Sequence, residues 1–236
     1  MSGAGSPQAG SEEPPTAPPE VLDAAVRAIE AGQIIGLPTD TVYGIGADPW
    51  RADAVERIFE AKGRPEAVAL PVLVGDPADA ATLAVLDDRA RRLIDRYWPG
   101  PLTIVLRRWE ATADTSGTTP TADAADTSGT GAAPPRRLHL GGDDKTVGIR
   151  CPDHPTARAL LVRTGPLAVT SANRHGGEPA HSVAELRASL GEAVGVVVDG
   201  GPLEGAPSTV VSLVEGDWRC LREGAITTDE LAALLD

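Results

Sequence analysis

Hydroxyl and cationic side chains recur in this 236-residue chain where short apolar runs end. Residues 37–46, LPTDTVYGIG, bring three hydroxyls, a carboxylate and two glycines together in one turn-like segment. Ligands of open α/β sheets bind beyond the ends of strands, and Arg and Lys at such places pair with phosphate or carboxylate groups. We therefore expect a ligand of that chemistry. The candidate side chains are Thr39, Asp40, Thr41, Lys62, Arg64, Thr146, Arg150, Thr170, Ser171, Asn173, Ser208, Thr209 and Arg222.

The sequence contains none of the common nucleotide, metal or nucleophile motifs. It lacks the P-loop pattern, and Gly44 and Gly46 have neither the third glycine nor the following acidic residue of a dinucleotide fingerprint. The four histidines form no H-x-x-x-H pair, so no metal-ligand set is predicted. There is no G-x-S-x-G elbow either. Covalent catalysis is therefore not indicated.

Apolar periodicity predicts the elements that position these side chains. Helices are expected at residues 21–31, 54–62, 90–97 and 157–161, and two more are opened by the capping-box pairs Ser182/Glu185 and Thr227/Glu230. Strands are expected at residues 34–37, 70–74, 102–106, 146–150, 167–170, 194–199, 209–213 and 218–221. Pro71 suggests an edge strand or a strand start, and His154 is expected to cap the adjacent turn. This order predicts a single α/β domain with a twisted, mixed parallel and antiparallel sheet and flanking helices.

Two segments are unlike the rest of the chain. Residues 1–20 are rich in Pro, Gly, Ser and Glu, which is typical of a disordered tail. Residues 110–137 contain ADTSGT twice and are interpreted as a low-complexity surface insertion. The remaining regions, 21–109 and 138–236, have roughly 190 residues together, which matches the size of one domain.

Charge and composition exclude several classes of protein. The formal net charge is −13; the tail contributes −3 and the insertion −2, which leaves about −8 on the body. A broad basic nucleic-acid face is therefore not expected. No apolar run approaches the ~20 residues of a membrane span and no secretory signal is present, so a soluble, cytoplasmic protein is expected. Cys151 and Cys220 match no metal or redox spacing and are interpreted as structural thiols.

Seven short motifs resemble those of the YrdC family, in the order of that family. Each motif alone is modest, but seven in sequence are specific. The resemblance covers residues 21–236 apart from the insertion. The motifs are LPTDTVYGIGAD (37–48), KGRP (62–65), WPGPLT (98–103), VGIRCPDHP (147–155), TSAN (170–173), STVV (208–211) and LREG (221–224).

This resemblance implies a short, single-domain threonylcarbamoyl-AMP synthase, a nucleotidyltransferase. Such an enzyme condenses L-threonine, bicarbonate and ATP with release of diphosphate, with Mg²⁺ accompanying ATP, and a downstream tRNA threonylcarbamoyl transferase uses the product next to the anticodon. The family pattern assigns L-threonine binding to Thr39, Arg150 and Ser208. It assigns catalysis to Lys62 and Arg64. The ATP-binding residues that it implies are Lys62, Arg64, Thr146, Ser171, Asn173 and Arg222.

Alternative interpretations stay open at the level of sequence. A YrdC-like paralogue could bind RNA or nucleotide without synthase activity, and weak contact with double-stranded RNA or tRNA is compatible with the family. Thr39 and Thr41 could be turn-forming hydroxyls, Arg150 a surface ion-pair residue, and Lys62 a cation in the last turn of a helix. Two stretches also depart from the family pattern: residues 69–70, where Ala precedes Leu, and residues 171–180, SANRHGGEPA.

Overall fold

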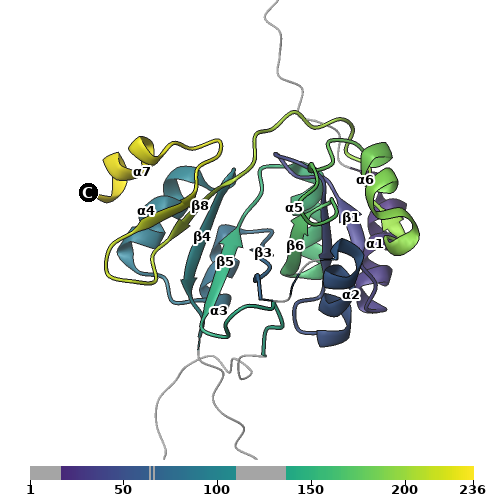
Figure 1. Cartoon of the computed structure of the whole chain (residues 1–236), viewed down its shortest axis with the longest axis horizontal. Helices are drawn as coiled ribbons and strands as arrows, with labels where there is room; N and C mark the ends of the chain where they lie inside the picture. The colour runs from purple at the N-terminus through teal and green to yellow at the C-terminus, as the bar shows by residue number, and fades with distance from the viewer. Residues whose placement is uncertain (1–16, 64, 66, 110–136) are drawn as a thin grey trace, which may run out of the picture.

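One nine-stranded sheet organises the part of the chain that the computed structural model describes, residues 17–63, 65, 67–109 and 137–236 (Figure 1). The strand order is β7-β1-β2-β6-β3-β5-β4-β8-β9. The pairs β1/β7, β3/β5 and β4/β8 are parallel and the others antiparallel, which confirms the predicted mixed sheet. The strands are β1 Ile35–Leu37, β2 Gly44–Ala47, β3 Val72–Leu73, β4 Leu102–Arg107, β5 Thr146–Arg150, β6 Leu167–Ser171, β7 Val196–Val197, β8 Thr209–Ser212 and β9 Arg219–Arg222.

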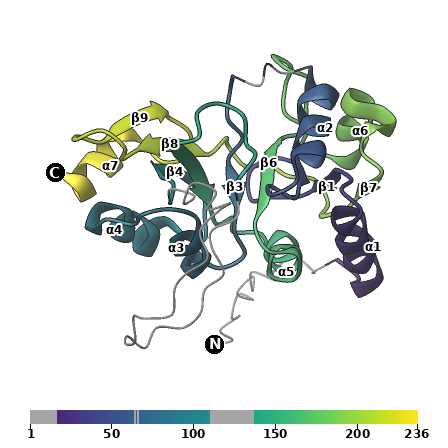
Figure 2. The same ribbon diagram turned by 90° about the horizontal axis from the view of Figure 1, so that it is seen from below.

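Helices flank the sheet, and four of them, α1, α3, α4 and α5, lie along one side of it in Figure 2. Leu22 and Ile29 of α1 and Leu160 of α5 pack with Ile35 and Leu37 of β1 in one apolar cluster. Within the described residues, every helix is too short or too polar to cross a membrane. The helices are α1 Pro19–Glu30, α2 Ala52–Lys62, α3 Ala80–Leu83, α4 Asp88–Tyr97, α5 Pro155–Thr164, α6 Val183–Leu190 and α7 Thr228–Leu235, with short 3-10 turns η1 Pro77–Asp79 and η2 Gly191–Ala193.

The central strands bury one face and leave the other available for a ligand. Successive side chains of a strand point to opposite faces, so Ile104 of β4 enters the core while Thr103 and Val105 face the other way. The pairings Thr103↔Val210 and Val105↔Gly148 place Val210 of β8 and Gly148 of β5 on that second face. The sheet thereby provides the floor of a cavity.

Strand β2 was not predicted, because its sequence GIGA was interpreted as part of a turn. The two glycines serve close packing between strands. A Cβ at Gly44 would lie 2.7 Å from Val169 Cγ1, and one at Gly46 would lie 3.0 Å from Val169 Cγ2. Glycines therefore leave room for Val169 where β6 pairs with β2, and glycine is permitted in a strand at such close approaches.

Strand β3 lies in the middle of the sheet, between β6 and β5, so the edge position suggested by Pro71 is wrong. Pro71 directly precedes β3, as the strand-start alternative required. A proline can hold this place because its carbonyl still accepts a hydrogen bond, here from Val169 N at 2.9 Å.

The predicted boundaries and caps are partly corrected. Helix α1 begins at Pro19, inside the expected tail of residues 1–20, and Ala17 is buried with its N–H donated to Thr156 Oγ1. Thr227 and Glu230 form the predicted capping box. Ser182 caps α6, but Glu185 accepts from the N–H of His181, one residue earlier than a capping box requires. Residues 1–16, and 110–136 of the expected insertion, lie outside the described residues.

Candidate functional site

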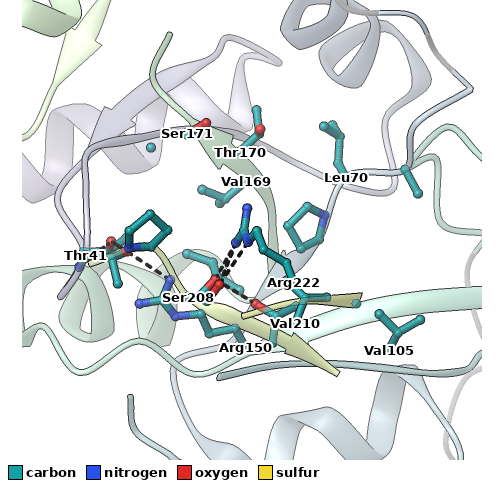
Figure 3. A pocket seen from close by; sticks show the side chains of 18 of the residues that line it. Thr41, Leu70, Val105, Arg150, Val169, Thr170, Ser171, Ser208, Val210 and Arg222 are labelled. Atoms are coloured by element: carbon teal, nitrogen blue, oxygen red, sulfur yellow. Dashed lines mark hydrogen bonds between the residues drawn. The ribbon is translucent and has the colours of Figure 1, made fainter. Parts of the chain in front are cut away.

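A cavity of about 570 Å³ opens over the exposed face of the central strands. This volume is in the range of small-molecule pockets. Figure 3 shows Thr41, Arg150 and Ser208 at one end and Val105 toward the other. The polar lining residues are Thr39, Thr41, Thr103, Thr146, Arg150, Thr170, Ser171, Ser208 and Arg222, and apolar ones include Leu70, Val105, Val169 and Val210.

Arg150, the last residue of β5, is held by a buried ion pair with Asp40. Its Nη2 donates to Asp40 Oδ1 at 2.5 Å, and the side chains are only 7% and 13% exposed. Nη1 donates to Thr41 Oγ1 at 3.1 Å and Nε to the carbonyl of Gly100 at 3.0 Å. Burial lowers the pKa of Arg150, and Asp40 opposes that shift. These contacts therefore fix the orientation of the guanidinium, and Asp40 also compensates its charge.

Thr39 organises the turn that carries Asp40 and Thr41. Its hydroxyl donates to the carbonyl of Val42 at 2.7 Å and accepts from the N–H groups of Thr41 and Val42, both at 3.2 Å. The two threonine hydroxyls lie 2.9 Å apart. The turn-forming role considered for these residues is therefore present, and both also line the cavity.

Ser208 and Arg222 lie together where β8 pairs with β9. Arg222 donates from Nε and Nη2 to the carbonyl of Ser208 and from Nη2 to its hydroxyl at 3.0 Å (Figure 3). Thr103 Oγ1 lies 3.3 Å from Ser208 Oγ. A Cβ at Gly224 would lie 2.1 Å from the carbonyl oxygen of Pro207, so the LREG glycine permits this close approach.

Lys62 and Asn173 lie beside the cavity rather than in its described lining. The buried ammonium of Lys62 donates to the carbonyls of Ser171 and Asn173 and to Asn173 Oδ1, at 2.5 to 3.0 Å. Asn173 Oδ1 also accepts from Ser171 Oγ, and its amide donates to the carbonyls of Arg174 and Gly177. These two side chains shape the TSAN loop, and Ser171 carries that loop to the cavity wall.

Two predicted site residues remain, Thr146 and Arg64. Thr146 lines the cavity, and its hydroxyl donates to the carboxylate of Asp143. Arg64 lies outside the described residues. The structure thus brings together Thr39, Arg150, Ser208, Thr146, Ser171 and Arg222 around one cavity, and places Lys62 and Asn173 behind the wall that Ser171 forms.

The electrostatic character of the cavity suits an anion. Among its described lining residues the charged ones are Arg150 and Arg222, and none is a carboxylate. No three His, Cys, Asp or Glu side chains of the described residues come together as metal ligands. The cavity therefore offers hydroxyl and guanidinium donors to phosphate or carboxylate oxygens.

His154 does not cap a helix, contrary to expectation. It occupies the N-cap position of α5 without a side-chain cap hydrogen bond, and its buried Nδ1 has no partner among the described residues. Burial lowers the pKa of His154, and Asp40 and Asp153 oppose part of that shift. The imidazole lies near Gly200 instead, with its Cε1 3.0 Å from where a Cβ of Gly200 would be.

Two contributors to the site, Gly100 and Thr103, were not among the candidates from the sequence, and Asp40 was a candidate without a specific role. Asp40 is the counter-ion of Arg150, which a sequence cannot indicate because 110 positions separate the two. Gly100 supplies a backbone carbonyl, which no residue type reveals. Thr103 could have been found, because it alternates with buried Leu102 and Ile104 on a predicted strand.

Known proteins share both the sequence and the fold of this chain. The Sua5/YciO/YrdC family model, described as "Telomere recombination", matches residues 27–224. A Mycobacterium tuberculosis relative, provisionally named a threonylcarbamoyl-AMP synthase, is 38% identical over 213 residues, which cover 89% of this chain and 87% of that protein.

Two solved structures have the same fold. Sua5 of P. abyssi complexed with L-threonine superposes with a TM-score of 0.76 at 31% identity, over 91% of this chain and 57% of that one. E. coli YciO superposes with a TM-score of 0.74 at 28% identity, over 92% and 96%. These likenesses confirm the predicted fold over about nine tenths of the chain.

Replacing Asp40 should destabilise the fold, because Arg150 would remain as a buried charge without its counter-ion. Asp40→Asn keeps the side-chain shape but removes the counter-ion of Arg150, so we expect the free energy of unfolding to fall by roughly 3 kcal/mol. Urea denaturation measures this change. The control Asp53→Asn breaks solvent-exposed pairs with Arg51 and Arg57 and should have a much smaller effect. Equal losses in the two variants would contradict the proposed role of Asp40.

His154 should make stability depend on pH. The imidazole of the unfolded chain titrates near 6.5, whereas that of the folded chain titrates lower. As pH falls below 6.5 the unfolded state takes up the proton first, so the free energy of unfolding decreases, by at most about 1.4 kcal/mol per pH unit. Urea titrations at several pH values from above 6.5 downward should give His154→Gln a shallower slope than the parent chain. The exposed control His175→Gln should keep the parent slope, and a parent-like slope for His154→Gln would refute the effect.

Proposed function

This chain belongs to the Sua5/YciO/YrdC family, and on that premise we propose that it makes L-threonylcarbamoyl-AMP from L-threonine, bicarbonate and ATP. The observation that carries the proposal is the cavity itself, in which Arg150, Arg222 and hydroxyl groups converge without a carboxylate among the described lining residues. All three substrates are anions or carry anionic groups. Named threonylcarbamoyl-AMP synthases among the relatives support the same reaction.

The chemistry needs positioning more than an enzyme nucleophile. The amine of threonine combines with bicarbonate to give an N-carboxylate and water. An oxygen of this carbamate then attacks the α-phosphorus of ATP, and the bond to the β-phosphate oxygen breaks to release diphosphate. A cavity that fixes both reactants and stabilises phosphoryl charge can supply the catalysis. This agrees with the absence of a nucleophile motif in the sequence.

The threonine subsite is proposed at the end of the cavity where Thr39, Arg150 and Ser208 meet. Thr41, Asp40 and Gly100 accept three of the five N–H bonds of Arg150, which leaves one on each terminal nitrogen in the described contacts. A forked guanidinium presented in this way suits the carboxylate of an amino acid. The solved P. abyssi relative contains L-threonine, which supports an amino-acid subsite in this fold.

The nucleotide is proposed to occupy the rest of the cavity. Arg222, Thr146 and Ser171 offer donors to phosphate or ribose oxygens, and Val105 and Val210 provide an apolar surface. Lys62 and Asn173 act in this proposal by shaping the loop that presents Ser171. The family resemblance assigns phosphate contact to Lys62 and Arg64, and that assignment stays a prediction.

Magnesium is proposed to enter as part of the substrate. The described residues offer no carboxylate cluster for a resident ion, so the fit favours Mg²⁺ held by the phosphates of ATP. The ion would neutralise phosphate charge during displacement of diphosphate. We further propose a cytoplasmic nucleotidyltransferase whose product a tRNA threonylcarbamoyl transferase consumes.

The proposed reaction is tested directly by incubating the full chain with Mg–ATP, L-threonine and bicarbonate. We expect diphosphate release that requires all three substrates, and an adduct with the mass of threonylcarbamoyl-AMP. Omitting bicarbonate or replacing L-threonine by D-threonine is the control. ATP binding by calorimetry without any adduct would favour the alternative, a paralogue that binds nucleotide or RNA without turnover.

Arg150→Lys tests the threonine subsite while preserving a cation opposite Asp40. The substitution loses the fork that matches a carboxylate, so the KM for L-threonine should rise about tenfold, equivalent to about 1.4 kcal/mol. The KM for ATP should change less than about threefold, within the range expected of an indirect effect. Initial rates at varied concentrations of each substrate measure both values. Equal increases would show that Arg150 does not belong to the amino-acid end.

A further inference from the structure

A long connection crosses the sheet over the threonine end of the cavity. Residues 199–208, here called the strap, lead from β7 at one edge of the sheet to β8 beside the opposite edge (Figure 1). The strap ends in Pro207 and Ser208, and both line the cavity. Its position therefore decides where Ser208 lies relative to the other site residues.

The hydroxyl of Tyr43 is hydrogen-bonded to the first three residues of the strap. Its side chain is fully buried, and its hydroxyl accepts from the N–H of Gly200 at 3.0 Å. The same hydroxyl lies within donating distance of the carbonyl of Gly201, 2.8 Å, and of Asp199 Oδ1, 3.1 Å. Burial, more than any other cause, raises the pKa of Tyr43 to about 12, so the hydroxyl keeps its proton and can donate.

The middle of the strap lies directly on the turn that holds Arg150. A Cβ at Gly205 would lie 2.2 Å from the carbonyl oxygen of Asp40 and 2.6 Å from Thr41 Cα. Between these points, Leu203 donates its N–H to the carbonyl of His181 and places its own carbonyl 2.9 Å from His181 Nδ1. The turn of residues 39–41 is thus enclosed between the strands and the strap.

One short segment of sequence therefore does two tasks. Thr39 and Thr41 line the cavity. Tyr43, two residues further along the chain, is hydrogen-bonded to the strap. A phenylalanine would fill the same buried volume as Tyr43. The hydroxyl is needed only for its bonds to residues 199–201, which do not line the cavity.

We propose that Tyr43 is a positioning residue for L-threonine: its hydroxyl fixes the strap, and the strap holds Ser208 and the Asp40–Thr41 turn in register with Arg150. This inference rests on the proposed function. It assigns a role in substrate binding to a side chain that does not reach the cavity itself.

Tyr43→Phe tests the proposal, with Tyr97→Phe as the matched control. Tyr97 is the other tyrosine of the chain, and its hydroxyl makes one long bond, 3.4 Å, to the carbonyl of Glu230. We expect Tyr43→Phe to raise the KM for L-threonine on the order of tenfold, as a lost buried hydrogen bond would. The KM for ATP and kcat should stay within about twofold of the parent. Tyr97→Phe should leave all three values unchanged.

Gly205→Ala provides a second variant that leaves Tyr43 intact. Its new methyl group collides with backbone, so the strap must move away from Asp40 and the KM for L-threonine should rise again. Calorimetric titration with L-threonine gives a readout that is independent of turnover. If Tyr43→Phe does not fold, Gly205→Ala decides whether the position of the strap sets the affinity for L-threonine, and an unchanged affinity overturns the proposal.

The outcomes separate the two levels of inference. A parent chain without synthase activity and without L-threonine binding contradicts the proposed function. An active parent whose KM for L-threonine is unchanged in both folded variants overturns the role of the strap alone. Equal increases in the KM for L-threonine and ATP also overturn it, because a general loss of structure would produce that pattern.

Discussion

The buried pair of Asp40 and Arg150 is the interaction on which the site depends. A guanidinium taken out of water is costly unless its charge and its N–H bonds are compensated. Asp40 supplies the charge, and Thr41 Oγ1 and the carbonyl of Gly100 supply two further acceptors. Three distant segments of the chain, residues 39–41, 98–101 and the end of β5, must therefore meet at one point. The LPTDT, WPGP and VGIR motifs can be understood as the three parts of this arrangement.

Glycine residues allow the layers around that pair to approach closely. Gly44 and Gly46 make room for Val169, Gly205 for the backbone of Asp40, and Gly224 for that of Pro207. The glycines of LPTDTVYGIG thus have no need to cradle a phosphate. Their absence of side chains lets β6 and β2 pair tightly, and this places Ser171 beside Gly44 at the cavity wall.

The parts of the fold and the site that could be predicted are those whose sequence signals are local. Periodicity located α2 and α4, because each buries one face and exposes the other, and short apolar runs located β4 and β5. Strand β2 was missed because its glycines serve a distant side chain, and the central position of β3 could not follow from two residues of strand. Arg150 and Ser208, which were predicted from motifs, line the cavity because their side chains lie on its side of the sheet. The burial of Lys62 against the carbonyls of Ser171 and Asn173 is a tertiary contact across 109 and 111 positions, and no local pattern encodes it.

The contrast between the whole chain and its cavity reconciles the acidity of the protein with the anionic substrates proposed for it. The net charge of −13 repels anions at long range, but solvent ions screen such a field beyond a Debye length of about 8 Å. Inside the cavity, Arg150 and Arg222 act at contact distance, and Arg150 is buried, where a charge interacts much more strongly than in water. Because Asp40 lies behind Arg150 and outside the described lining, it orients the guanidinium without presenting its own carboxylate to a ligand. The pair therefore presents a cation of fixed orientation to the cavity without presenting a carboxylate that would repel an anionic ligand.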